Sequence, residues 1–315
     1  MDHKVSDFPE IFLDKVGKPL EQSISLQDYS NFKIGGRADY FFEATSTSEL
    51  ANSMSIAREQ AIPYYIIGGG YNLLFDDDGF RGLIIKNRVE GIKQRQKRVE
   101  IEVFSGTPLS DVLQFSMEEG LTGFEFLAGI PGTIGGAVHG NAGAFGHSIG
   151  EFLKEAEILD ERCQRIKVKR DYFGFEYRYS LLKEKQSVFL AAMFVLQEGE
   201  REKMKALIRD NLEKRKEKHP PLDVPCAGSF FKNPIFPDGK RVPAAYLLDK
   251  VGVKKLAVGG AAVYSGQANF IINKGDASAR DVLQLAEELK QRVKKGYGID
   301  LEEEVIFLPA SPPLP

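Results

Sequence analysis

Two glycine-rich stretches are the part of this sequence whose residue types most directly indicate chemistry. The sequence IIGGGYNLL covers residues 66–74, and LAGIPGTIGGAVHGNAGAFG covers residues 127–146 with seven glycines. Because glycine has no Cβ, successive backbone amides in such loops can converge on an anion without obstruction. Two loops of this kind suit a diphosphate in the middle of a long molecule. Tight turns and close packing are the other interpretation of the same glycines, and it stays open here.

The phosphate-binding pattern of a Rossmann fold, GxGxxG, is absent from both stretches. That pattern depends on glycines at fixed spacing between a strand and a helix. The sequence therefore predicts that a dinucleotide, if one is bound, is held by another fold.

Strands and helices are expected to alternate around the two stretches. β-branched and aromatic runs predict strands, and a 3.6-residue apolar period predicts helices. Ser46 and Glu49 have capping-box spacing at the start of the helix expected after the strand at 37–44. Gly120 is expected to end the helix at 108–120. The other strands expected in this first α+β unit are 62–67, 82–87, 99–106, 155–160, 164–170 and 187–198.

A charged amphipathic helix at 200–219 is expected to lead from the first unit into a second one. Its apolar spacing predicts that Met204, Leu207, Ile208 and Leu212 face inward, and two prolines follow it. The second unit contains an expected helix at 277–298, whose inward positions are Val282, Leu285, Leu289 and Val293, and expected strands at 268–275 and 302–308. The domain prediction is an N-terminal extension at 1–29, a first domain at 30–198, a second at 199–308 and a flexible tail at 309–315.

Composition excludes several classes of protein. The net charge of −3 and pI near 6.0 give no basic field for nucleic acid, and no apolar run is long enough to span a membrane. Cys163 and Cys226 lie far apart, and the four histidines are scattered, so we expect free thiols and no metal site. The mixed charges of the first residues do not resemble a secretory signal, which favours a cytoplasmic location.

Seven segments, in order from about residue 30 to 307, resemble the UDP-N-acetylenolpyruvoylglucosamine reductase family of peptidoglycan synthesis. They are FKIGGRADYFFE, GGGYNLL, GFEFLAGIPGTIGGAVHGNAGAFG, YRYS, AGSFFKNP, GGAAVYSGQANFIIN and LEEEV. The interval between Asn141 and Ser229 is short and lacks an extra tyrosine-bearing loop, so the chain is similar to the shorter, type II form.

The resemblance implies an α+β fold, with a two-subdomain FAD-binding region of the vanillyl-alcohol-oxidase (PCMH) type followed by a smaller α+β substrate domain. It implies FAD and NADPH as cofactors, and reduction of the enolpyruvyl ether of UDP-N-acetylglucosamine to UDP-N-acetylmuramate by a monomer or weak oligomer. We expect Gly132, Gly135 and Gly136 to approach the FAD diphosphate closely. The full set implied to hold FAD is Ile67, Gly68, Gly69, Gly70, Tyr71, Asn72, Leu73, Pro131, Gly132, Thr133, Gly135, Gly136, Asn141, Ala142 and Gly143.

Three polar residues are implied to be catalytic. Reduction of an enolpyruvyl ether needs charge stabilisation beside the carboxylate and a proton for the adjacent carbon. The resemblance implies Ser229 as proton donor, with Arg178 and Glu304 stabilising the intermediate. Glu302 would share a strand face with Glu304, so the choice between them rests on the motif alone. The residues implied to bind the UDP-sugar are Lys218, Lys232, Asn233 and Asn269.

The chain departs from the family pattern at four places, and two other functions remain open. Ser30 with Asn31, Tyr71, Gly140 and Gln267 replace the usual Asn-Thr, Ser, Met and His, which bears on flavin and substrate contacts. One alternative is another FAD-dependent oxidoreductase, for which His139 or His147 could hold a covalent flavin. The other is a non-catalytic UDP-sugar-binding protein, which the presence of all three catalytic residues disfavours.

Overall fold

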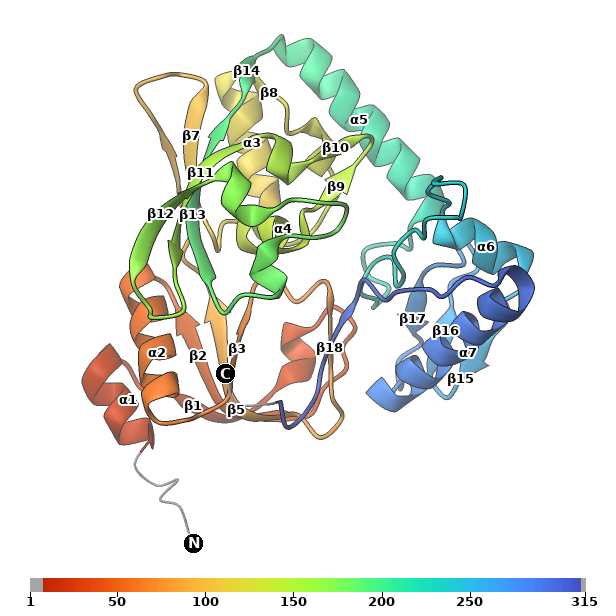
Figure 1. Ribbon diagram of the computed structural model, residues 1–315, viewed down its shortest axis with the longest axis horizontal. Helices are drawn as coiled ribbons and strands as arrows, with labels where there is room; N and C mark the ends of the chain where they lie inside the picture. The colour runs from red at the N-terminus through yellow and green to blue at the C-terminus, as the bar shows by residue number, and fades with distance from the viewer. Residues whose placement is uncertain (1–7, 313–315) are drawn as a thin grey trace, which may run out of the picture.

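The first subdomain is built on a mixed four-stranded sheet. The computed structural model describes residues 8–312, and in it the strands of this sheet follow the order β1-β2-β5-β3 (Figure 1). β1 runs antiparallel to β2, while β2 and β3 both run parallel to β5. The elements are α1 (Phe8–Val16), β1 (Glu21–Ser25), β2 (Arg37–Ala44), α2 (Thr47–Glu59), β3 (Tyr64–Ile67) and β5 (Phe80–Asn87).

The described part of the predicted N-terminal extension belongs to this subdomain. β1 is an edge strand of the sheet, and the ring of Phe12 lies 5.0 Å from that of Phe42 on β2. Residues 1–7 lie outside the described part of the chain. The predicted helix start is confirmed, because the Ser46 side chain accepts a hydrogen bond from the Glu49 backbone N–H at 3.2 Å.

The second subdomain contains a fully antiparallel five-stranded sheet of order β12-β11-β13-β7-β6. Its core, with Phe124, Phe194 and Val112 among the buried side chains, lies between this sheet and α3 and α4. Gly120 ends α3 with φ 67°, as predicted. The elements are β6 (Ile92–Gln94), β7 (Glu100–Phe104), α3 (Leu109–Glu119), β8 (Leu121–Thr122), α4 (Ile134–Gly140), β9 (Gly143–Ala144), β10 (His147–Ser148), β11 (Leu153–Leu159), β12 (Arg165–Lys169), β13 (Val188–Val195) and β14 (Gln197–Glu198).

The predicted bridging helix, α5 (Arg201–Lys218), is present, but its inward face differs from the prediction. Leu207 and Leu212 are 46% and 44% exposed, whereas Met204 and Asn211 are buried. The buried Asn211 side chain donates a hydrogen bond to the Glu125 carbonyl at 3.0 Å. This polar contact fixes the helix against the second subdomain in a rotation that the apolar period does not indicate. Figure 1 shows α5 running from that subdomain towards the C-terminal domain.

The C-terminal domain packs two helices against a small antiparallel sheet. The Ser278–Asp281 capping box begins α7 and Gly298 ends it. Val282, Leu285, Leu289 and Val293 are fully buried, which confirms the predicted inward face. The elements are α6 (Ala244–Lys250), β15 (Ala257–Val258), β16 (Ala261–Val263), β17 (Ile271–Asn273) and α7 (Ala279–Tyr297).

The last strand leaves the C-terminal domain and returns to the first subdomain. β18 (Ile306–Leu308) pairs in parallel with β4 (Leu73–Phe75), the strand that follows the first glycine loop (Figure 1). Part of the predicted flexible tail is also held, because the Ala310 carbonyl accepts a hydrogen bond from Arg81 N at 2.6 Å. Residues 313–315 lie outside the described part. In the opposite direction, Phe32 and Ile34 contribute to the core of the C-terminal domain.

Within residues 8–312, no helix is both long and apolar enough to cross a bilayer, and no cluster of side chains suits a metal ion. Both cysteines are free thiols, as predicted.

Candidate functional site

The first glycine loop, residues 67–73 between β3 and β4, is closed by protein atoms. A Cβ on Gly70 would lie 1.9 Å from the Tyr29 carbonyl oxygen, and its φ of +73° also favours glycine. A Cβ on Gly68 would lie 2.5 Å from Thr133 Oγ1, and one on Gly69 would lie 3.2 Å from Gly132 Cα. The two glycine loops therefore lie directly against each other. Close packing accounts for these three glycines.

Lys86 lies beneath the first loop and was not identified from the sequence. Its Nζ donates a hydrogen bond to the Gly68 carbonyl at 2.6 Å and lies 5.9 Å from the Tyr29 ring centroid. Burial lowers the pKa of Lys86. The sequence feature that could have identified Lys86 is its place in the apolar strand segment GLIIKN, because a lysine enclosed in a strand needs a partner.

The second glycine loop, residues 131–143, presents open space in the places where a cofactor would need it. No atom lies within 4 Å of the position of a Cβ on Gly132, and only Thr133 Oγ1 does so for Gly136, at 3.7 Å. Gly135 differs, because its Cβ would lie 2.9 Å from the Ser105 carbonyl oxygen. A backbone cradle that side chains would fill fits a bound diphosphate, so the residues present are compatible with FAD.

Asn141, at the end of α4, uses its side chain to hold protein backbone. Its Nδ2 donates to the Glu176 carbonyl at 2.7 Å, and its Oδ1 accepts from Gly150 N at 3.1 Å. The residue is buried and adopts the left-handed conformation, with φ 43°. Its amide thus connects the second glycine loop to the segment that carries Arg178.

Arg178 lies between that loop and Glu304. Its Nη2 donates to the Gly143 carbonyl at 2.8 Å, and its Nε lies 2.8 Å from Glu304 Oε1, an ion pair in which the N–H is not aligned for a hydrogen bond. Arg178 has φ +56°, an uncommon conformation for a residue with a Cβ. Lys183 Nζ donates to the Arg178 carbonyl at 2.8 Å, which holds this conformation in place. Strained residues of this kind gather at functional sites.

Glu304 is a half-buried carboxylate among cations. Burial raises its pKa, and Arg178, Lys183 and Lys232 oppose that rise. Its backbone carbonyl accepts a hydrogen bond from Asn72 Nδ2 of the first glycine loop at 3.0 Å. The neighbouring candidate, Glu302, has a side chain 72% exposed against 21% for Glu304. Glu304 is therefore the carboxylate that the fold encloses beside Arg178.

The segment carrying Ser229 runs beside the segment carrying Glu304. Glu304 N donates to the Phe230 carbonyl at 2.8 Å, so the two segments are directly hydrogen-bonded. The buried Asn269 holds the same segment, accepting from Phe231 N at 3.0 Å and donating to the Phe231 carbonyl at 2.9 Å. The half-buried Ser229 hydroxyl forms no hydrogen bond with residues 8–312. The fold thus gathers the segments of all three predicted catalytic residues.

The other residues predicted to bind substrate lie at the edge of this group. Lys232 forms an ion pair with Glu302, and Asn233 Oδ1 accepts from Ala244 N at 3.0 Å, at the start of α6. The backbone N–H of Asn233 donates to the Tyr177 hydroxyl at 3.4 Å. Lys218 is exposed at the C-terminal end of α5. Lys232 and Asn233 therefore lie near the Arg178 segment, whereas Lys218 forms no hydrogen bond or ion pair with it among residues 8–312.

Lys183 is a second residue that sequence reasoning missed. Burial lowers its pKa, and so does the nearby charge of Lys232, against the opposing effect of Glu304. It follows Arg178 by five positions, in YRYSLLK, and nothing in that spacing indicates that the two residues meet.

The four departures from the family pattern fall in different surroundings. Ser30 Oγ donates to the Leu73 carbonyl at 3.3 Å, and Tyr71 is 39% exposed on the first loop. The space around a Cβ on Gly140 is open. Gln267 Oε1 is buried without a hydrogen-bond partner among the described residues. None of these positions disturbs the Arg178–Glu304 ion pair.

The two histidines considered for a covalent flavin also differ. Burial, and to a lesser degree Lys183, lowers the pKa of His139 to about 4. His147 is exposed, and its Nδ1 lies 3.0 Å from Glu151 Oε2.

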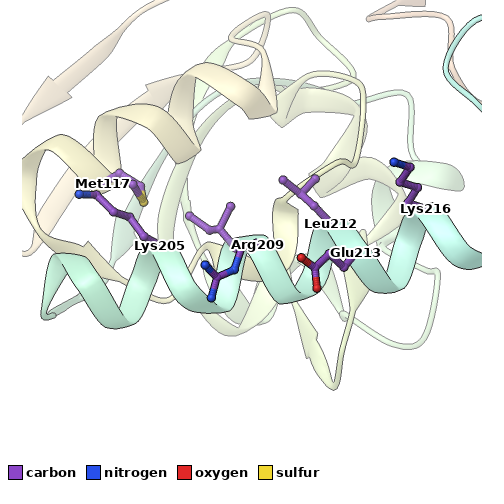
Figure 2. Close-up of a pocket in the computed structure, with 7 residues that line it drawn as sticks. Met117, Lys205, Arg209, Leu212, Glu213 and Lys216 are labelled. Atoms are coloured by element: carbon purple, nitrogen blue, oxygen red, sulfur yellow. The ribbon is translucent and has the colours of Figure 1, made fainter.

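A groove along α5 is separate from this site. Figure 2 shows Met117 of α3 beside the α5 side chains that line it, and no predicted catalytic residue is among them. The remaining lining residues are Lys205, Ile208, Arg209, Leu212, Glu213 and Lys216.

Comparison with known proteins gives a consistent result over both domains. A family model of the FAD binding domain matches residues 38–168, and one of the UDP-N-acetylenolpyruvoylglucosamine reductase C-terminal domain matches residues 220–308. Helix α5 falls between the two.

Whole-length relatives agree. A UDP-N-acetylenolpyruvoylglucosamine reductase of Geotalea uraniireducens is 39% identical over 281 residues, covering 88% of this chain and 90% of that protein. One of Chlamydia muridarum is 37% identical over 297 residues, covering 94% and 96%. The crystal structure of the reductase from Thermus caldophilus matches with a TM-score of 0.74 at 30% identity, covering 92% of this chain and 99% of that one. The expected α+β architecture, an FAD-binding region followed by a smaller domain, is confirmed.

Proposed function

The chain belongs to the UDP-N-acetylenolpyruvoylglucosamine reductase family of FAD-dependent oxidoreductases, and we propose that it reduces the enolpyruvyl ether of UDP-N-acetylglucosamine to UDP-N-acetylmuramate. In this proposal NADPH is the reductant, and the reaction serves peptidoglycan precursor synthesis in the cytoplasm. The protein acts as a monomer or weak oligomer.

The observation that carries the proposal is the ion pair between Arg178 and Glu304. The two residues are 126 positions apart in the sequence, yet Arg178 Nε lies 2.8 Å from Glu304 Oε1. Each is fixed to a different glycine loop, Arg178 through the Gly143 carbonyl and Glu304 through Asn72. This arrangement supports a site in which the charged pair is positioned by the same loops that hold the cofactor.

FAD fits the open backbone of the second loop at Gly132 and Gly136. Lys86 supplies a cation beneath the first loop, close to the Gly68 carbonyl that it holds. When bound, FAD supplies the two-electron chemistry that links NADPH oxidation to reduction of the substrate double bond. The protein has to bind the substrate, stabilise the charge that develops on it and provide a proton.

Arg178 and Glu304 act on the carboxylate side of the substrate. As that side becomes enolate-like, the Arg178 guanidinium stabilises the added negative charge. The raised pKa of Glu304 makes its carboxyl take up a proton more readily than an exposed one, so it can share a proton with the substrate carboxylate. The Lys183 hydrogen bond to the Arg178 carbonyl keeps the guanidinium in position.

Ser229 donates the proton to the carbon next to the carboxylate. Its hydroxyl is not engaged by residues 8–312, which leaves it available to substrate. Lys232, Asn233 and Lys218 bind the UDP part of the substrate. Asn269 contributes indirectly, because both ends of its amide hold the Phe231 backbone beside Ser229.

The first experiment is to purify the protein, record its flavin absorbance, and follow NADPH oxidation with and without the enolpyruvyl UDP-sugar. We expect a yellow protein whose NADPH oxidation depends on that substrate. A colourless protein that binds UDP-sugar would contradict the proposal. Flavin that stays with acid-precipitated protein would instead support an enzyme with covalently held FAD.

The Ser229→Ala variant tests the proton donor. General acid catalysis typically contributes a factor of about 100 to 10,000, and we expect turnover to fall by that factor. Flavin content should be unchanged, and the loss of one hydroxyl should cost at most about 1 kcal/mol of stability. Steady-state NADPH oxidation and urea unfolding measure the two effects. Near-normal turnover would remove Ser229 from the mechanism.

A further inference from the structure

Arg215 lies on the buried face of α5 and is assigned no role by the motifs discussed above. It follows the buried Asn211 by four positions, one helical turn along the same face. A Cβ on Gly129 would lie 3.0 Å from Arg215 Cδ, so the aliphatic part of the side chain packs on the segment just before the second glycine loop. The guanidinium is therefore held at a defined place.

The guanidinium has no anionic partner there. Across residues 8–312, Arg215 takes part in no ion pair and its side chain makes no hydrogen bond, and its Nε is fully buried. Its Cζ lies 5.6 Å from the Phe145 ring centroid, which offers only the face of an aromatic ring. Arg215 as a whole is half-buried, and an arginine fork without an anionic partner is suited to binding a carboxylate or a phosphate.

Its position relates it to the candidate active site. The Phe145 ring lies against Arg215, and Phe145 comes two residues after Gly143 in the chain. The Gly143 carbonyl accepts a hydrogen bond from Arg178 Nη2. The two arginines thus share one short turn, but only Arg178 has a carboxylate beside it. Burial and the charge of Arg178 lower the pKa of Arg215 to about 10, which agrees with the two guanidinium groups lying close together.

The next turn of α5 leads to the segment that carries Ser229. The His219 ring lies 5.0 Å from the Phe270 ring, and Phe270 follows Asn269, which holds the Phe231 backbone. Arg215 therefore lies between the second glycine loop and the C-terminal domain, on the side where the substrate segments meet.

We propose that Arg215 binds an anionic group of the sugar-nucleotide substrate, a carboxylate or a phosphate, at the boundary between the second glycine loop and the C-terminal domain. The inference rests on the proposed function. FAD also carries a diphosphate, so the two possible sources of the anion have to be separated by experiment. We assign it to the substrate because α5 leads towards the Ser229 segment.

The test compares Arg215→Gln and Arg215→Lys with Arg209→Gln, an exposed arginine on the same helix that serves as the matched control. Flavin per protein is measured by absorbance, and binding of UDP-N-acetylmuramate and of UDP by calorimetry on the holoenzyme. We expect Arg215→Gln to weaken UDP-N-acetylmuramate binding at least 10-fold, with partial recovery in Arg215→Lys and no change in Arg209→Gln. Flavin content should stay the same. A parallel loss for UDP would identify the anion as the diphosphate, and an unchanged UDP affinity would identify it as the carboxylate.

Stability gives an independent readout. Because Arg215 has no anionic partner to lose, the thermal midpoint of Arg215→Gln should equal or exceed that of the parent, whereas a structural role would lower it. The inference is overturned if flavin is lost while sugar-nucleotide affinity is kept, if neither changes, or if the midpoint falls. A different result would contradict the proposed function: the parent protein would neither bind UDP-N-acetylmuramate nor oxidise NADPH in the presence of the enolpyruvyl substrate.

Discussion

The two glycine loops are both glycine-rich, but their surroundings differ. In the first loop, the Cβ positions of Gly68, Gly69 and Gly70 are occupied by other protein atoms. In the second, Gly132 and Gly136 face open space. A glycine that the fold itself requires and a glycine that leaves room for a ligand look the same in a sequence. The structure separates them.

The loops also differ in which catalytic residue they hold. The first contacts the Glu304 segment through Asn72, whose Nδ2 donates to the Glu304 carbonyl and whose carbonyl accepts from Ile306 N. The second holds the Arg178 segment through the Asn141 amide, with contacts to Glu176 and Gly150, and through the Gly143 carbonyl. Both loops are thus connected to the charged centre, and the second is the more open of the two. Variants in the two loops should separate folding from cofactor binding.

The largest effect is expected for Gly70→Ala in the first loop. The added Cβ meets the Tyr29 carbonyl at 1.9 Å, and φ +73° strains any residue with a Cβ. Together these should cost about 3 kcal/mol or more, measured by urea unfolding. Gly146→Ala is the control, because it has φ +88° with no atom within 4 Å and so isolates the strain. Equal losses in the two variants would show that the collision is unimportant.

Gly136 in the second loop should behave in the opposite way. Ala is favoured over Gly in a helix by up to about 1 kcal/mol, and the nearest atom to the new Cβ is 3.7 Å away, so Gly136→Ala should fold at least as well as the parent. If the open space holds FAD, flavin content should drop, and further in Gly136→Val. Absorbance of the purified proteins measures this. A full flavin complement in Gly136→Val would place the cofactor elsewhere.

A smaller effect is expected for Asn141→Ala. The change leaves the buried Gly150 N unpaired, and an unsatisfied buried group costs about 1 to 3 kcal/mol, whereas the Glu176 carbonyl keeps its hydrogen bond from Tyr179 N. Asn72→Ala, which removes one side-chain hydrogen bond, should cost about 1 kcal/mol. Urea unfolding compares the two variants. Loss of flavin from Asn141→Ala with unchanged stability would mean that the side chain serves the cofactor rather than the Arg178 segment.

The smallest effect concerns His139, near the end of α4. Burial lowers its pKa from 6.5 to about 4, so the unfolded chain takes up this proton at higher pH than the folded protein. The contribution of His139 to stability is therefore present above pH 6.5, falls as the pH drops towards 4, and levels off below that. Unfolding free energies of His139→Gln should decline less steeply over this interval than those of the parent. Parallel curves would contradict the assignment.

Patterns of neighbouring residues correctly predicted helix ends and helix faces that depend on contacts within the same segment. The inward face of α7 followed from its apolar period, and the ends of α2 and α3 followed from Ser46 and Gly120. The family motifs also indicated Arg178, Glu304 and Ser229 as the catalytic residues. Their segments do meet in the structure.

Other features depend on contacts between distant residues. The rotation of α5 is set by Asn211 meeting the Glu125 carbonyl, 86 positions away, and no helical period contains that information. Lys86 and Lys183 act through backbone carbonyls, which carry no sequence signature. The guanidinium of Arg215 has no acidic partner among the described residues, and only the three-dimensional structure reveals this.

The pairing of β18 with β4 has a consequence for the order in which the chain matures during translation. Leu308 is part of the core that also contains Phe75, Phe80 and Ile84 from the first subdomain. That core stays incomplete until residues 306–308 have left the ribosome, although its other members are made much earlier. A nascent chain ending before residue 306 would therefore expose this apolar face, a surface that chaperones recognise. Stable capture of the cofactor should accordingly wait until β18 has emerged and paired with β4.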